Sequence, residues 1–147
     1  MVTTGVQEDP DLLADGWQPI RPGAFVNLIG PFYSRVRDGR TQFCFRVAAK
    51  HDNTQGRPHG GMIMAFLDEG MGWATHIARP DDRFFTVSFD CQFIGGSVEG
   101  DLVVADTAVV SSTRSLMFMR GECRVGDRLI ASASGIWKAR KPRDQGG

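Results

Sequence analysis

An α+β domain, in which an antiparallel β-sheet wraps around one long central α-helix, is the fold that this sequence predicts. Ten of the sixteen residues from 62 to 77 are apolar, and a helix that is apolar on most sides is surrounded by other structure rather than lying on a surface. Two strand-like runs precede this segment and four follow it, with short connections between them. An antiparallel sheet that curls around the helix provides the surroundings that its apolar sides require.

Local signals predict the elements that precede the helix. The apolar residues 25–29 fit either a short helix or the start of a strand. Asp38-Gly39 is a strong hairpin-turn signal, and residues 31–36 and 42–48 on its two sides are predicted to form the paired strands. Residues 51–58 are dense in turn formers and are predicted to be a loop.

The helix itself is predicted over residues 60–77, because Pro80 shortly after this stretch cannot continue it. Each of the runs that follow either alternates in polarity or is rich in β-branched and aromatic residues. The four strands after the helix are therefore predicted at residues 84–94, 101–110, 115–124 and 129–139.

Length and composition limit the organisation of the chain. With 147 residues, of which 41% are hydrophobic, the chain suits a single domain over residues 1–147 with a real core. Residues 1–16 are polar, acidic and rich in breakers, so we expect a loose N-terminal arm there. Lys and Arg balance Asp and Glu at 17 each, and this zero net charge favours neither nucleic acid nor a membrane surface as a partner.

The cysteines and the lengths of the apolar runs indicate the cellular compartment in which the protein is expected. Cys44, Cys91 and Cys123 are odd in number and widely spaced in strand-like runs, so we expect small buried thiols in a reducing environment. No run is apolar and long enough to span a bilayer, and no secretory signal pattern is present. These features predict a cytoplasmic enzyme or binding module.

The start of the predicted helix carries the pattern that indicates function. His59-Gly60-Gly61 opens the helix, and Asp68 interrupts its apolar body. Glycine costs about 0.8–1 kcal/mol relative to alanine inside a helix, so two glycines suggest that a ligand approaches the backbone. Unpaired N–H groups and the positive end of the helix dipole suit a polarised carbonyl. Burying a carboxylate in an apolar helix is costly unless it has a charge or hydrogen-bond partner or a functional role. Together these features predict an active site.

These residues, with two others, resemble the hotdog-fold acyl-CoA thioesterases of the phenylacetate-pathway and thioesterase superfamily member 2 type. The resemblance covers residues 53–139. It implies hydrolysis of a thioester between a carboxylic acid and coenzyme A, with no cofactor beyond the coenzyme A of the substrate and no metal. The positions that carry it are, in chain order, Asn53, His59-Gly60-Gly61, Asp68 and Ser88.

The spacing of two of these residues predicts an oligomer. His59 and Asp68 are nine helical residues apart, about 13–14 Å at about 1.5 Å per residue. One reacting carbonyl cannot contact both the Gly60 N–H and Asp68 of the same chain, so a second subunit must present its helix antiparallel. Two-fold symmetry then gives a homodimer with two shared sites. The resemblance implies the same arrangement, and relatives stack two such dimers into a homotetramer.

We expect the thioester carbonyl oxygen to accept a hydrogen bond from the backbone N–H of Gly60 or Gly61. Asp68 is predicted either to act as the general base for water or to attack directly and form an anhydride. Ser88 would orient the water. Glu69 lies about 100° around the helix from Asp68, so we expect only one of the two to face the site.

Other residues have supporting roles in this hypothesis. Asn53 would hold the loop, or orient the water or the carbonyl, and His59 would fix Asn53 and the loop rather than transfer a proton. His51 and His76 are expected in loops or on the surface, and no histidine has metal-ligand spacing.

The substrate contacts are predicted less sharply. Arg114, in the turn before the third of the later strands, resembles a family position near the pantetheine and nucleotide, and Arg57 is a second candidate for the phosphates. Met64 and Met71 belong either to the core or to an acyl pocket. The acyl group is left open between an aryl ring and an aliphatic chain of medium or long length.

Two alternative functions belong to other classes. A module that binds acyl-CoA without cleaving it would be favoured if Asp68 were missing or a DNA-binding segment were attached. Hydratases of acyl thioesters carry an Asp and a His a few residues apart, which the spacings from Asp52 to His59 and from Asp68 to His76 fit poorly. Release of free thiol from an acyl-CoA distinguishes hydrolysis from binding.

Overall fold

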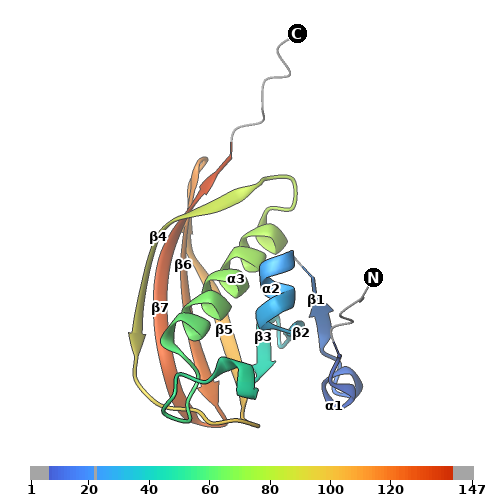
Figure 1. The fold of residues 1–147 in the computed structure, drawn as a ribbon. Helices are drawn as coiled ribbons and strands as arrows, with labels where there is room; N and C mark the ends of the chain where they lie inside the picture. The colour runs from blue at the N-terminus through green and yellow to red at the C-terminus, as the bar shows by residue number, and fades with distance from the viewer. Residues whose placement is uncertain (1–6, 22, 141–147) are drawn as a thin grey trace.

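In the computed structural model, which describes residues 7–21 and 23–140, an antiparallel sheet of seven strands curls around one long helix, α3 (Gly60–Ala78) (Figure 1). The strands lie in the order β1-β2-β3-β5-β6-β7-β4, so β1 and β4 are the two edges. This arrangement confirms the predicted α+β class. Besides α3, the elements are α1 (Pro10–Ala14), β1 (Gln18–Ile20), α2 (Ala24–Ile29), β2 (Phe32–Arg37), β3 (Arg40–Arg46), the 3-10 helix η1 (Ala49–His51), β4 (Phe84–Phe93), β5 (Leu102–Ser112), β6 (Leu116–Val125) and β7 (Arg128–Ala139).

The core lies between α3 and the inner face of the sheet. Phe66 of the helix is buried, and its ring centroid lies 4.7 Å from that of Phe45 and 5.3 Å from that of Phe32. Tilted and edge-on aromatic pairs of this kind stabilise a core beyond the area they bury. A Cβ at Gly70 would lie 3.1 Å from the Phe43 ring, so glycine lets the middle of the helix approach the sheet closely.

The hairpin and the segment before it were predicted in part. Asp38 and Gly39 both have positive φ, 52° and 72°, which is the backbone of the tight turn that joins β2 to β3. Residues 25–29 form all of helix α2 except its first residue, Ala24, whereas β1 was not predicted. Strand β1 has only three residues, too few for alternation to reveal it.

Part of the segment that was expected to be a loose arm, residues 1–16, is ordered, because residues 10–14 form α1; residues 1–6 lie outside the described residues. Leu12 of α1 and Trp17 are buried, with exposed fractions of 4% and 1%, in a second cluster with Tyr33 and Cys44 on the outer face of the sheet. Two apolar residues spaced along a polar segment are enough to anchor it, because they reach a hydrophobic patch made by distant strands.

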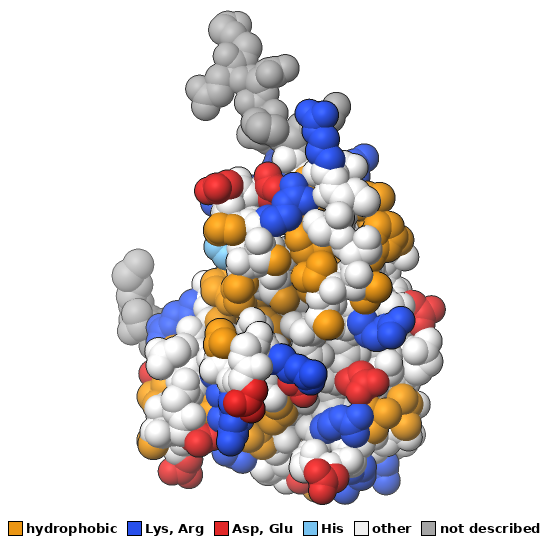
Figure 2. Space-filling view, turned by 180° about the vertical axis from the view of Figure 1, so that it is seen from behind, with side chains coloured by type: hydrophobic (Ala, Val, Ile, Leu, Met, Phe, Trp, Pro, Cys, Tyr) orange, Lys and Arg blue, Asp and Glu red, His pale blue; other side chains and the backbone are white. Residues whose placement is uncertain are grey.

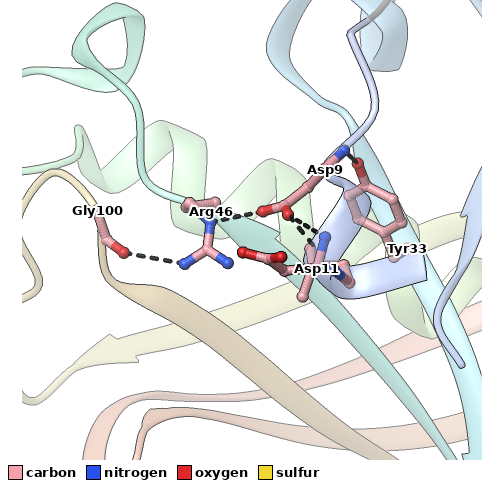
Figure 3. A network of polar contacts seen from close by, with 6 residues as sticks. Asp9, Asp11, Tyr33, Arg46 and Gly100 are labelled. Atoms are coloured by element: carbon pink, nitrogen blue, oxygen red, sulfur yellow. Dashed lines mark hydrogen bonds and ion pairs between the residues drawn. The ribbon is translucent and has the colours of Figure 1, made fainter. Parts of the chain in front are cut away.

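A polar network also fastens this segment (Figure 3). The Asp9 carboxylate caps α1 by accepting from the N–H of Asp11 at 3.0 Å, and it pairs with Arg46 Nε at 2.7 Å. The Asp9 N–H donates to the Tyr33 hydroxyl at 2.8 Å, and Arg46 Nη1 donates to the Gly100 carbonyl at 3.1 Å. The hydrogen bond from Arg46 is the main reason that the pKa of Asp9 is lowered.

Substituting Asp9 by Ala is expected to lower the free energy of unfolding by about 0.5–2 kcal/mol, the usual cost of losing an N-cap. Because the folded-state pKa of Asp9 lies below its ordinary value of 3.8, this stabilisation is present above about pH 4 and is lost as the pH falls through the folded pKa. Urea unfolding of both proteins at pH 7 and at pH 3 measures it. An equal difference at the two pH values would contradict the assigned role.

His51 differs from the expected surface residue, because it is buried at the junction of η1 and α2. Its Nε2 lies 2.7 Å from the Ile29 carbonyl oxygen, and its Nδ1 accepts from the Ala48 N–H at 3.0 Å. Burial lowers its pKa. Two of the three cysteines, Cys44 and Cys123, are buried free thiols as predicted, and Cys91 is partly buried. No helix of the described chain has the length and apolar character needed to cross a bilayer.

Candidate functional site

The start of α3 is held by the side chain of its own N-cap. His59 Nδ1 accepts a hydrogen bond from the Gly61 N–H at 2.8 Å. A Cβ at Gly61 would lie 2.9 Å from this Nδ1, so the cap requires glycine at position 61. Because the Gly61 N–H is occupied, the Gly60 N–H is the free donor at the helix start: it has no acceptor among residues 7–21 and 23–140.

The loop before the helix is closed on itself. The Asn53 N–H donates to the Arg57 carbonyl at 2.8 Å, and Asn53 Oδ1 accepts from the Gln55 N–H at 2.9 Å. The His59 N–H donates to the His51 carbonyl at 2.7 Å. Asn53 therefore holds the loop, which is one of its predicted roles. The predicted contact between His59 and Asn53 is not formed, because the imidazole turns to the helix instead.

Asp68 lies in the wall of an open cavity between α3 and β4. Its Oδ1 accepts a hydrogen bond from the Thr86 hydroxyl at 2.7 Å, and its side chain is partly buried. The cavity has a volume of about 430 Å³ and aromatic walls that include Trp73, Phe84 and Trp137. A carboxylate with one oxygen bonded and one side open to a cavity can accept a proton from a bound water.

Glu69 lines the same cavity, so the expectation that only one of the two neighbouring acids faces it is wrong. The α3 residues of the cavity wall extend from Asp68 to His76, so the cavity is wide enough to take in both acids. Burial raises the pKa of Glu69, and the neighbouring Asp68 charge raises it further. His76, expected at the surface, is partly buried and also lines this cavity.

Ser88 does not reach Asp68. The pairing of β4 with β7 shifts register between Thr86, opposite Trp137, and Ser88, opposite Ile136. Ser88 consequently lines a different cavity of about 300 Å³ beside Phe118 on the outer face of the sheet. Thr86 is the β4 residue whose hydroxyl reaches Asp68. Alternation along the strand cannot show this, because the irregularity changes which residues face the helix.

Of the five predicted substrate contacts, Gly61 belongs to the helix start described above, and the other four lie in different places. Arg57 is exposed beside the loop and lies across Gly96, where a Cβ would overlap its guanidinium group. The Arg114 carbonyl accepts from Arg79 Nη2 at 3.1 Å, which places this turn at the far end of α3 from His59. Two further candidates are on the helix, and they differ in exposure: Met64 is 37% exposed, whereas Met71 is fully buried in the core.

Comparisons with known proteins agree with one another. Residues 55–132 match the model of the thioesterase superfamily. A Pseudomonas aeruginosa protein whose name describes it as an esterase is 33% identical over 127 residues, covering 84% of this chain and 94% of that protein. Two solved structures are similar in fold. A Bacillus halodurans protein crystallised with CoA is 18% identical, with a TM-score of 0.74, over 97% of this chain and 100% of that one. A mutant of the phenylacetic acid degradation protein of Thermus thermophilus is 22% identical, with a TM-score of 0.69, over 78% of this chain and 96% of that one.

Proposed function

From its membership of the thioesterase superfamily, which makes this chain a thioester hydrolase, we propose that it cleaves thioesters of coenzyme A in a site shared by two copies of the chain. The observation that carries the proposal is the Asp68 carboxylate, which faces an open cavity with one oxygen held by the Thr86 hydroxyl. The presence of CoA in the Bacillus halodurans structure supports this choice of thiol.

A second copy is needed because of the length of the helix. The Gly60 N–H and Asp68 of one chain are separated by eight helical residues, about 12 Å, which is more than one thioester carbonyl and its water can bridge. Strand β4 offers a place for the partner, since it is an edge strand with Phe85 and Val87 about half exposed. An exposed apolar edge favours pairing with another strand. Two copies joined there by a two-fold axis would set their α3 helices antiparallel.

In the proposed reaction, the carbonyl oxygen of the thioester accepts a hydrogen bond from the Gly60 N–H of one subunit. Asp68 of the partner subunit removes a proton from water, and the water oxygen bonds to the acyl carbon. The carbon–sulfur bond then breaks, and the departing thiolate takes up a proton to give free CoA and the carboxylic acid. Direct attack by Asp68 is the second route, in which an anhydride forms and water then cleaves it. Both routes use the carboxylate oxygen that Thr86 leaves free.

The cavity beside Asp68 is the proposed place for the acyl group. Its volume of about 430 Å³ lies within the usual range for small-molecule sites. Of the two arginines, Arg57 is close to the helix start and is the better placed to meet a phosphate of CoA from the same subunit. Arg114 would meet the substrate only from the partner subunit, since it lies at the other end of α3.

A tetramer of two stacked dimers would use the outer face of the sheet. The N-terminal segment covers this face over β2 and β3, whereas the cavity beside Phe118 and Ile136 stays open. In Figure 2, hydrophobic side chains gather in the upper half of the molecule, with charged side chains around them. An open apolar region of this kind supports contact with a second dimer.

Thiol release from a panel of aryl, medium-chain and long-chain acyl-CoAs tests the proposal. We expect the purified protein to release CoA from at least one of them. Binding of acyl-CoA without any release would instead support a non-catalytic binding module. Sedimentation of the same sample measures whether the active species is a dimer or a tetramer.

A further inference from the structure

Phe93, the last residue of β4, has its ring against the start of α3. A Cβ built at Gly60 would lie 3.2 Å from Phe93 Cζ and 3.3 Å from Phe93 Cε1. Non-bonded carbon atoms usually stay about 3.5–4.0 Å apart, so the ring occupies the space that any other residue at position 60 would need. The Cα–Cβ direction in a helix tilts toward the N-terminus. The ring therefore lies on the N-terminal side of Gly60, the side toward which the N–H groups of a helix point.

The exposure of Phe93 is unusual for an aromatic residue that faces the helix. Its exposed fraction is 55%, whereas Phe43 and Phe45 on the same inner side of the sheet are fully buried. One side of the ring thus contacts the helix start, and much of the rest is exposed in the single chain. A ring in this position removes water from one side of the Gly60 N–H, and a hydrogen bond to a polarised carbonyl is stronger where water is excluded.

We propose that Phe93 is a positioning residue for the thioester, whose ring holds the carbonyl against the Gly60 N–H and keeps water out of that hydrogen bond. This inference rests on the proposed function. It also gives Gly60 a second reason to be glycine: the missing side chain leaves room for the ring as well as for the substrate.

The test compares three substitutions at Phe93 with a matched control. Phe93→Ala is expected to lower kcat by about 10- to 100-fold, because the thioester carbonyl is no longer held in line with the Gly60 N–H. Phe93→Tyr keeps the ring and is expected to retain kcat within about twofold, with Phe93→Leu between the two. Ile94→Ala is the control, since Ile94 is the next residue and is equally exposed at 55%. Its kcat should equal that of the wild type.

Thermal unfolding of each variant separates loss of alignment from loss of folding. Loss of kcat in Phe93→Ala, with recovery in Phe93→Tyr and an unchanged melting temperature, would support the inference. Wild-type kcat in Phe93→Ala, or an equal fall in Ile94→Ala, would overturn it while leaving the proposed function intact. Absence of thiol release by the wild type from every thioester would overturn both.

Discussion

Replacing Asp68 by Asn is expected to lower kcat for thioester hydrolysis by about 10²- to 10⁴-fold, the usual contribution of a general base. The amide has nearly the shape of the carboxylate and can still accept the hydrogen bond of the Thr86 hydroxyl, so the local structure should persist. It cannot take a proton from water or attack the acyl carbon, so both proposed routes are closed. Thiol release by the two proteins at matched acyl-CoA concentrations measures the effect.

Two other acids serve as comparisons for Asp68. Asp90→Asn is the matched control, because Asp90 lies on β4 but lines the cavity on the outer face of the sheet, and it should leave kcat unchanged. Glu69→Gln changes the neighbouring acid in the same cavity and should cost less than Asp68→Asn. If Glu69→Gln were inactive while Asp68→Asn kept its activity, the base would have been assigned to the wrong residue.

Substituting Gly61 by Ala is expected to lower kcat by about 10²- to 10³-fold, the loss that follows removal of one carbonyl-binding donor. The new Cβ would lie 2.9 Å from His59 Nδ1, so the imidazole must move and the first turn with the Gly60 N–H moves with it. Loss of the cap is also expected to lower the free energy of unfolding by about 1 kcal/mol. Steady-state kinetics and urea unfolding measure the two effects.

The variant His59→Asn tests whether the His59 side chain only caps α3 or also takes part in the reaction. Asn is a favoured N-cap residue and can accept the Gly61 N–H, so this variant should keep most of the stability and most of the activity. A stable but inactive His59→Asn would show that the imidazole takes part in the reaction, which contradicts the capping role.

The fold was predictable where the signals are local. The bounds of α3 follow from an apolar run that begins after His59-Gly60-Gly61 and ends before Pro80, and the helix differs from the prediction by only its last residue, Ala78. With the family match, the hotdog fold expected from the sequence is confirmed. The order of the N-terminal segment was not predictable, because Leu12 is buried by contacts with strands far along the chain.

The candidate site also contains residues that local signals predict and residues that they do not. Gly60 and Asp68 could be recognised from their immediate neighbours in the sequence. Glycine at a helix start and an acid in an apolar helix are both unusual. Thr86 was missed because an irregularity in β4, visible only in its pairing with β7, decides which side chain faces the helix. Phe93 carries no local signal at all, since its contact with Gly60 joins the end of a strand to the start of a helix.

Heterodimers of two inactive chains test most directly whether the site is shared. Chains carrying Asp68→Asn and chains carrying Gly61→Ala, each with a different affinity tag, can be expressed together and the mixed dimer isolated by two purification steps. One site of that dimer has both substitutions and the other has neither. We predict about half of the wild-type activity per dimer, although each variant alone is inactive. A mixed dimer as inactive as the two parent variants would show that each site uses Asp68 and Gly61 of the same chain, and would contradict the shared site.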